Sequence, residues 1–228
     1  MRFQRSKDAP ITAGAQRREY EAITRRIAGD VDGRVLDWGA GLGQVTALLI
    51  AAGVEVEAFD YDGKTDGVVP LEPHFPELSV RRSSDPVVLP YPDDSFAAVL
   101  SCGVLEHVED PTGSLLEIRR VLRTGGMLYV FKLPNERSYL EWIARHVGLD
   151  YHGQFVFDRL YTPTTARRLV ESCGYRVREV RYANMLPLTL TARWLQPLAG
   201  AIWSVSRSLS RLPVIRTLAT NVELVATK

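Results

Sequence analysis

Short runs of β-branched residues alternate along the chain with segments whose apolar positions recur every three or four residues. The alternation is clearest where a run at Arg34–Trp38 leads into a glycine-rich turn, a helical pattern over Gln44–Ala52 and a second run at Val54–Phe59. A strand, a helix and a second strand at this spacing are typical of a parallel crossover unit. A sheet built from such units carries helices on both faces.

The same periodicities predict the remaining elements. The further predicted strands are Leu78–Arg82, Phe96–Ser101, Met127–Lys132, Val177–Tyr182 and Val222–Thr227. The further predicted helices are Tyr20–Ile27, Pro111–Leu122 and Thr164–Cys173, and Thr124-Gly125-Gly126 predicts a turn. We therefore expect an α/β fold with a doubly wound, mostly parallel, seven-stranded Rossmann-like sheet.

Glycine recurs in the turn after the first predicted strand, at Gly39, Gly41 and Gly43. Glycine lets a backbone turn tightly and approach a ligand without a Cβ in the way. In open parallel sheets, ligands bind at the carboxyl ends of the strands. Asp60 follows about twenty residues later, at the end of the second predicted strand, where a carboxylate can accept both hydroxyls of a ribose. The turn and Asp60 together predict a site for a nucleoside cofactor.

The charge around the turn discriminates between two kinds of nucleoside cofactor. Residues 35–63 contain no Lys or Arg, whereas Asp37, Asp60 and Asp62 lie at predicted strand ends. This field favours a cation over a pyrophosphate. Gln44 also occupies the position where a dinucleotide-binding loop has its last small residue. S-Adenosylmethionine, a sulfonium without phosphate, fits best, and a nucleotide-dependent oxidoreductase stays open as the alternative.

Four sequence blocks carry a family resemblance. The first predicted strand and its turn, Val35–Gly43, resemble the first motif of class I S-adenosylmethionine-dependent methyltransferases. Leu89–Phe96, Val104–Val108 and Arg120–Gly126 resemble later landmarks of the small-molecule branch of that family. The resemblance covers residues 34–132, and four blocks in order are far more specific than a glycine turn alone.

The resemblance implies how the glycine turn would contact the cofactor. The backbone of Gly39, Ala40, Gly41 and Gly43 would cradle the methionine part of S-adenosylmethionine. Asp37 would reach the ammonium of that part directly or through water.

The resemblance also implies partners for the rest of the cofactor. Asp60, with the adjacent Tyr61, would hold the ribose, and Asp85, with Pro86, would hold the adenine and accept from its amino group. Cys102 would offer its backbone carbonyl to the ammonium. The alternative for Asp60 is a solvated loop acid, and the alternative for Asp85 is a turn-forming residue before Pro86.

His107 is the candidate catalytic residue. Methyl transfer is an in-line displacement from an excellent leaving group, so positioning supplies much of the rate, but a hydroxyl acceptor usually needs a base. His107 follows the fourth predicted strand, and histidine is the residue type whose ordinary pKa suits a proton acceptor at neutral pH, although a structural or pocket-lining role is the alternative. His146, Tyr151 and His152 are further candidates, against lid-surface or packing roles. No metal site is predicted, because the chain lacks an H-x-x-x-H motif and a cysteine pair.

One segment near the end is basic and apolar. Residues 180–222 contain five arginines and no acid. Within them, apolar residues with helical spacing follow Pro197: Leu198, Ile202, Val205, Leu209 and Leu212. Three interpretations stay open: a cap over the substrate pocket, an interfacial helix at anionic lipid or a lipid-linked substrate, and a dimer contact.

Composition limits which binding partners and which cellular compartment we expect for this chain. The 228 residues, 46% of them hydrophobic, suit one domain, and a net charge of +1 argues against a nucleic-acid binder. Cys102 and Cys173 are the only cysteines, and neither a secretory signal nor a membrane-spanning run is visible. We expect a cytoplasmic protein whose only membrane contact would be peripheral, through the basic insertion, and we leave its oligomeric state open.

These observations predict a single methyltransferase domain over 1–228. Its expected parts are an N-terminal helical segment (1–33), a cofactor-binding core (34–132), a lid insertion (133–162) and a C-terminal part (163–228) with the basic helical insertion at 186–220. We expect methyl transfer from S-adenosylmethionine to a small-molecule, glycan or lipid-like acceptor, at oxygen. A non-catalytic partner subunit with the same fold is a second alternative.

Overall fold

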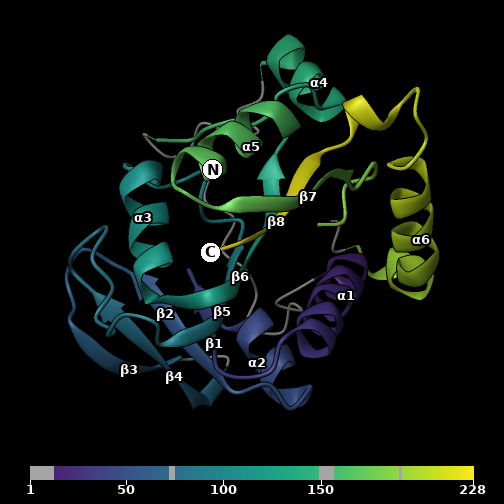
Figure 1. The fold of residues 1–228 in the computed structure, drawn as a ribbon. Coiled ribbons are helices and arrows are strands. Elements are labelled where there is room, and N and C mark those ends of the chain that lie inside the picture. The colour runs from purple at the N-terminus through teal and green to yellow at the C-terminus, as the bar shows by residue number, and fades with distance from the viewer. Residues whose placement is uncertain (1–12, 72–74, 149–156, 190–191) are drawn as a thin grey trace.

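An eight-stranded sheet with the order β3-β4-β2-β1-β5-β6-β8-β7 forms the centre of the molecule (Figure 1). The computed structural model describes residues 13–71, 75–148, 157–189 and 192–228. The strands are β1 (Val35–Trp38), β2 (Val56–Tyr61), β3 (Gly67–Leu71), β4 (Phe75–Ser83), β5 (Phe96–Cys102), β6 (Leu122–Pro134), β7 (Arg176–Ala183) and β8 (Asn221–Thr227). The helices are α1 (Gly14–Asp30), α2 (Gln44–Ala51), α3 (Pro111–Val121), α4 (Tyr139–Val147), α5 (Pro163–Ser172) and α6 (Ala199–Leu209), with 3₁₀ turns η1 (Arg193–Leu198) and η2 (Arg216–Leu218).

The order of the strands reverses beside β1. β1 pairs in parallel with β2 on one side and with β5 on the other, so that Val35 lies opposite both Val56 and Ala98. The chain first moves outward from β1 to β2 and β4 and then returns to β5 on the other side. Such a reversal leaves a crevice at the carboxyl ends of the strands, where ligands bind in open α/β sheets.

The sheet has one strand more than the seven predicted. The additional strand, β3, is an edge strand that pairs antiparallel with β4. Its sequence includes Pro70, which cannot donate to a ladder and is tolerated at a sheet edge. The predicted turn at Thr124–Gly126 is also wrong, because β6 already begins at Leu122. Gly125 takes a φ of 75° there, beside a shift in the register between β5 and β6.

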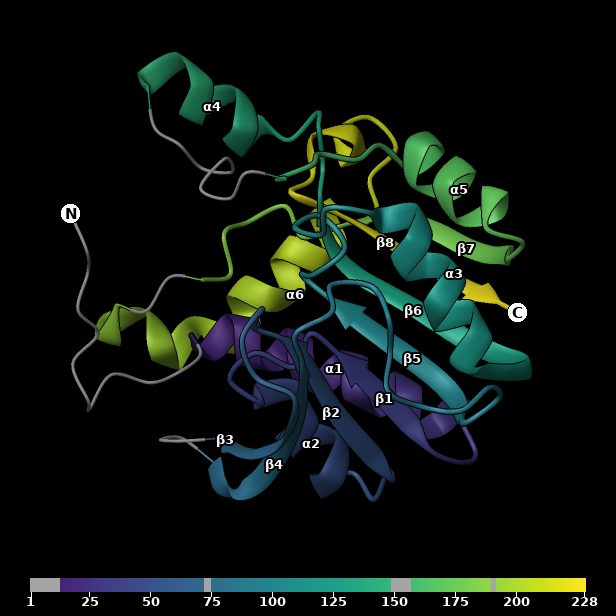
Figure 2. The same ribbon diagram turned by 90° about the vertical axis from the view of Figure 1, so that its left-hand side faces the viewer.

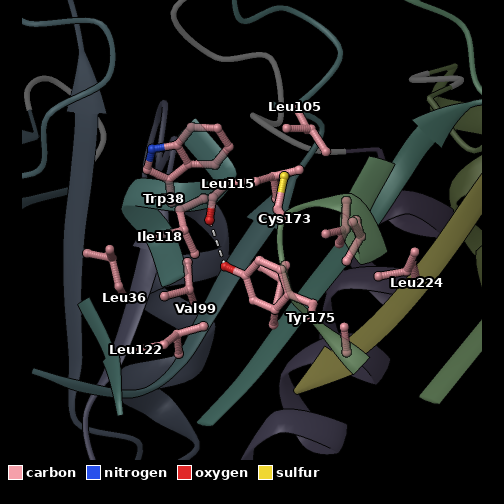
Figure 3. Close-up of a cluster of buried hydrophobic side chains, with 14 of the residues drawn as sticks. Leu36, Trp38, Val99, Leu105, Leu115, Ile118, Leu122, Cys173, Tyr175 and Leu224 are labelled. Carbon is pink, nitrogen blue, oxygen red and sulfur yellow. Dashed lines mark hydrogen bonds between the residues drawn. The ribbon is translucent and has the colours of Figure 1, made fainter. Parts of the chain in front are cut away.

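Helices cover both faces of the sheet and define two cores. On one face, α3 and α5 pack on alternate residues of β1, β5 and β6, among them Leu128. Figure 3 shows Leu36 of β1 and Val99 of β5 in this core. The hydroxyl of Tyr175 donates to the backbone carbonyl of Leu115 at 2.9 Å inside this core. On the other face, α1 and α2 pack on the intervening residues of the same strands. Strands buried on both faces explain the nearly continuous apolar runs of the sequence.

The two insertions differ in how they meet the domain. α4 projects away from the sheet, whereas α6 lies along α1 (Figures 1 and 2). α6 packs through Ala199, Ile202 and Trp203, and not through the whole apolar stripe expected from the sequence. Leu198 and Val205 of that stripe are 51% and 49% exposed. No described helix has both the length and the apolar character needed to cross a membrane.

Candidate active site

A cavity of ≈ 590 Å³ opens at the carboxyl ends of β1, β2, β4 and β5. Its walls are largely aromatic and apolar, as expected of a small-molecule site: Trp38, Phe59, Tyr61, Pro86, Val104 and Phe157. The acids at its lining are Asp60, Asp85 and Glu109, and no Lys or Arg of the described chain lines it. We call this space the first cavity. Its acidic lining favours a cationic ligand over a phosphate.

The glycine turn forms one wall of the first cavity and needs glycine for two different reasons. Gly39, Gly41 and Gly43 have φ angles of 79°, 55° and 78°, which disfavour residues with a Cβ. A Cβ on Gly39 would also overlap Val104, whereas one on Gly41 would meet nothing within 4 Å. The N–H groups of Gly39 and Ala40 both donate to the carbonyl of Phe59. The turn is thereby tied to the end of β2, and Ala40 faces the protein interior, 8% exposed.

Asp60 at the end of β2 points its carboxylate at the rim of the first cavity. Oδ2 accepts from the N–H of Gly41 at 3.1 Å, and Oδ1 accepts from the N–H of Tyr61 at 2.9 Å. These bonds fix the orientation of the carboxylate, and each oxygen retains capacity for a further donor. Burial raises the pKa of Asp60, against the hydrogen bonds that lower it. Tyr61 is half exposed at the same rim.

Asp37 lies beneath the turn and does not line the first cavity. It is 2% exposed and accepts a 2.6 Å hydrogen bond from the hydroxyl of Thr46 in α2. Burial raises the pKa of Asp37 to about 6, although the bond from Thr46 opposes the rise. The structure therefore places a carboxylate that is costly to ionise directly behind the glycine turn.

Of the remaining predicted cofactor residues, Asp85 and Pro86 line the first cavity and Cys102 lies next to a lining residue. Asp85 Oδ1 accepts from the N–H groups of Val87 and Val88 at 2.8 and 2.7 Å, which makes Asp85 the turn-forming residue considered above. Asp85 and Pro86 nevertheless line the cavity. Cys102 ends β5 immediately before the lining residue Gly103, and burial raises the pKa of its thiol. Both cysteines are free.

His107 sits where the first cavity meets a second one. It follows β5 in the loop to α3 and lies in the lining of both spaces. Its Nδ1 is 2.6 Å from Oδ1 of Asp158, whose side chain is 8% exposed. Its Nε2 lies 3.7 Å from Oε1 of Glu106. A carboxylate on Nδ1 fixes the tautomer that leaves Nε2 able to take a proton.

The chain returning from the lid insertion brings Asp158 to this histidine. The N–H of Arg159 donates to the carbonyl of Glu106 at 3.0 Å, and the Arg159 guanidinium donates to the carbonyls of Val108 and Glu109. These bonds fasten the returning segment to the loop that carries His107. The pairing joins residues 51 apart in sequence, and no local motif signals it.

The second cavity has a volume of ≈ 260 Å³, and its lining is more polar than that of the first cavity. Its polar lining includes Gln16, Glu19, Lys132, Asn184 and Asn221. Leu186, Pro187 and Leu188 of the basic insertion form another part of its wall. Buried Ser206 of α6 accepts from the N–H groups of Met185 and Leu186 at 2.9 and 3.0 Å and so fixes that wall.

Charged and polar groups of the second cavity form a cluster that is buried at Glu19 and Asn184 and half-buried at Lys132. The ammonium of Lys132 donates to the hydroxyl of Tyr20 at 3.2 Å and lies 4.9 Å from the centre of that ring. Burial opposes the charge of Lys132, but Tyr20, Cys102 and Glu19 outweigh it and raise its pKa. Asn184, with a φ of 61°, donates to the 1% exposed carboxylate of Glu19. Burial raises the pKa of Glu19.

Glu106 is a buried acid in the lining of the second cavity. Burial raises its pKa to about 7, against the opposing effect of a hydrogen bond from its own backbone and of nearby His107. Its Oε2 accepts no hydrogen bond within the part of the chain that the structure describes. Glu106 is therefore a group that can exchange a proton near neutral pH.

The other catalytic candidates lie elsewhere or outside the described residues. His146 in α4 bonds to the carbonyl of Trp142 and lines a separate cavity beside that tryptophan. Tyr151 and His152 lie outside the described residues. Among the described residues, no three His, Cys, Asp or Glu side chains are grouped so as to hold a metal ion.

The chain is similar to a methyltransferase family and to several methyltransferases. A family described as "Methyltransferase domain" matches residues 13–180. The ubiquinone biosynthesis O-methyltransferase of Aeromonas salmonicida is 26% identical over 176 residues, which cover 73% of each chain. A probable S-adenosylmethionine-dependent methyltransferase of Mycobacterium tuberculosis is 31% identical over 195 residues, which cover 82% of this chain and 69% of that protein. The demethylmenaquinone methyltransferase of Clavibacter sepedonicus is 34% identical over 119 residues, 48% of this chain and 44% of that protein.

Solved structures share the fold. A putative methyltransferase from Bacillus halodurans matches with a TM-score of 0.59 at 18% identity, over 91% of this chain and 98% of that one. The 1,6-didemethyltoxoflavin-N1-methyltransferase of Burkholderia thailandensis, solved with 1,6-didemethyltoxoflavin and S-adenosylhomocysteine, matches with a TM-score of 0.54 at 18% identity, over 93% and 77%. The sequence resemblance is confirmed: this chain belongs to the methyltransferase-domain family and is a class I S-adenosylmethionine-dependent methyltransferase.

Proposed function

We propose that the first cavity holds S-adenosylmethionine and the second cavity holds a small hydroxylated acceptor, which is methylated at oxygen. The observation that carries the proposal is the contrast between the two spaces, which meet at His107 and Gly103. One is apolar with an acidic rim and no basic lining residue among those described, and the other is polar and includes the half-buried ammonium of Lys132. The first suits a sulfonium cofactor, and the second suits a molecule with several hydroxyl groups.

The residues around the first cavity fit the cofactor. Asp60 is oriented by two backbone bonds and can accept from the ribose hydroxyls. Oδ1 of Asp85 accepts the hydrogen bonds of its own turn, so Oδ2 is available to accept from the adenine amino group. The open backbone at Gly41 would contact the methionine part, and the adjacent Asp37 and Cys102 would supply acceptors for its ammonium. When bound, S-adenosylmethionine supplies an electrophilic methyl group on a good leaving group.

The histidine between the cavities would handle the acceptor proton. His107 Nε2 takes the hydroxyl proton as the oxygen attacks, and Asp158 stabilises the charged ring that results. Glu106, 3.7 Å away, can receive that proton afterwards because its pKa is about 7. The apolar walls of the first cavity exclude water from the reacting carbon.

The names of the relatives support a small-molecule acceptor. Ubiquinone biosynthesis, demethylmenaquinone and 1,6-didemethyltoxoflavin appear in the names of proteins that this chain resembles. The ≈ 260 Å³ of the second cavity and its polar lining favour a sugar or phenol over a long acyl chain. Cytoplasmic location and peripheral membrane contact stay predictions. The latter has its support in Leu212 and Val214, 49% and 87% exposed in the basic insertion.

Calorimetry with S-adenosylhomocysteine tests the cofactor assignment. The protein should bind S-adenosylhomocysteine and not NAD. Asp60→Ala should weaken binding by roughly 1 to 3 kcal/mol, because ribose hydroxyls lose a charged acceptor. Asp32→Ala removes the same charge at an exposed site outside the cavity and should bind like the unaltered protein. Tight NAD binding, or equal affinities of the Asp60 and Asp32 variants, would contradict the assignment.

A further inference from the structure

A third cavity, of ≈ 350 Å³, lies beside the edge strand β7 and shares no lining residue with the first two. Four arginines line it: Arg181 from β7, Arg207 from α6, Arg211 after α6 and Arg216 from η2. Residues far apart in sequence are thus brought to one space. We call it the arginine pocket.

Acidic side chains balance only part of this charge. Glu223, whose side chain is 2% exposed, lies 2.6 Å from Arg181 and 3.5 Å from Arg207. Glu179 lies 3.0 Å from Arg181 but also pairs with Arg26 on α1. In the described chain, Arg211 and Arg216 are in no ion pair. The pocket therefore carries a surplus of positive charge on the order of two elementary charges.

Three of the four guanidinium groups also have unused donors. Arg181 donates to Glu223 at 2.7 Å. No side-chain hydrogen bond is made by Arg207, Arg211 or Arg216 within the described residues, and Oε1 of Glu223 beside Arg207 likewise accepts none. Exposed arginines can use water, but the side chain of Arg207 is only 17% exposed. Burial lowers the pKa of Arg207, and the neighbouring Arg181 and Arg211 add to this effect, against the acids Glu223 and Glu19 that raise it.

We propose that the arginine pocket binds a phosphate group. Guanidinium forks match the oxygens of phosphate in pairs, and a dianion would both neutralise the surplus charge and occupy the unused donors. The cavity has roughly ten times the ~30 Å³ of one water molecule, so it has room for a phosphate ester as well as for the free ion. The arginine pocket shares no lining residue with the two cavities of the proposed methyl transfer, so the phosphate proposal does not depend on the proposed function.

The phosphate could belong to a soluble molecule or to a lipid headgroup. Leu212 and Val214, between the two unpaired arginines, are 49% and 87% exposed. Apolar side chains beside basic ones are the arrangement by which a protein surface meets anionic lipid. A soluble phosphate would bind through the arginines alone, whereas a lipid headgroup would also use the exposed apolar side chains. Binding to a soluble phosphate and binding to vesicles therefore distinguish the two sources.

Two binding measurements test the arginine pocket. Pyrophosphate binding is followed by calorimetry, and co-sedimentation is measured with vesicles of phosphatidylglycerol and of phosphatidylcholine. The test variant is the double change Arg211→Gln and Arg216→Gln, at exposed and unpaired side chains that the fold does not need. The control is Arg167→Gln with Arg168→Gln, which removes the same charge from the exposed face of α5. S-Adenosylhomocysteine affinity is measured in every preparation to show that the fold is intact.

We expect the test variant to lose at least tenfold in affinity for pyrophosphate, for phosphatidylglycerol vesicles, or for both, while the control changes less than twofold. Binding of pyrophosphate identifies a site for soluble phosphates, and binding only to phosphatidylglycerol vesicles identifies a headgroup site. The proposal is overturned if neither probe binds, or if test and control variants lose affinity equally.

Discussion

His107 is the residue on which the proposed chemistry depends most directly. His107→Gln should lower kcat by about 10² to 10⁴-fold, the usual contribution of a positioned proton acceptor, and leave S-adenosylhomocysteine affinity within about threefold. Turnover is measured as S-adenosylhomocysteine released with the best acceptor from a panel of phenols and monosaccharides. Asp158→Asn should lower kcat less, because it weakens the orientation of the ring without removing it.

His146→Gln serves as the matched control for that experiment. His146 bonds to a carbonyl within its own helix and lines a different cavity, so its loss should leave kcat unchanged. Equal activity of the His107 and His146 variants would instead favour an amine or carboxylate acceptor, which needs no base.

At the level of elements, Gly39 in the glycine turn and Gly53 after α2 show that two glycines with the same φ angle are not equivalent. Gly39→Ala combines a left-handed backbone with overlap against Val104, and we expect it to lower the free energy of unfolding by roughly 2 to 4 kcal/mol. Gly53→Ala has the same φ of 79° with nothing within 4 Å and should cost only about 1 to 2 kcal/mol. Urea denaturation measures both. A loss no larger at Gly39 than at Gly53 would show that Val104 moves aside freely.

The elements also show where sequence patterns are informative. Strands buried on both faces, such as β5, have runs long enough to predict within a residue or two. The pattern of α1 predicted only Tyr20–Ile27, because the buried side of its first turns carries Ala15 and the charged Glu19 in place of large apolar residues. The spacing of Leu198, Ile202 and Val205 predicted a helix correctly. The spacing did not predict which side of α6 is buried, because α6 contacts α1 through small residues and Trp203.

At the scale of the whole molecule, the sequence predicts the lining of the first cavity better than that of the second. The polar residues of the first cavity lie at the carboxyl ends of β1, β2, β4 and β5, so the order of strands along the chain places them together. The second cavity instead joins Glu19, Lys132 and Asn184 from three distant segments. Glu19 and Asn184 are 165 residues apart, and in sequence each is an ordinary polar residue. Only tertiary packing makes them a buried cluster, so local patterns did not reveal it.

Buried acids should also give the whole chain an unusual dependence of stability on pH. Glu106 has its pKa raised from 4.5 to about 7 and Asp37 from 3.8 to about 6. Between the ordinary and the raised values the folded chain binds more protons than the unfolded chain, so the free energy of unfolding falls as pH rises.

Glu106 alone contributes on the order of 3 kcal/mol to that fall, between about pH 4.5 and 7. Urea denaturation of the ligand-free protein from pH 5 to 7.5 measures it. Glu106→Gln should lose clearly less stability over this range than the unaltered protein, because glutamine stays neutral throughout. Glu55→Gln, at a carboxylate that is 76% exposed, should retain the full fall. If the Glu106 variant kept the same slope as the Glu55 variant, Glu106 would be ionised in the folded protein at pH 5 and could not receive a proton from His107 near neutrality.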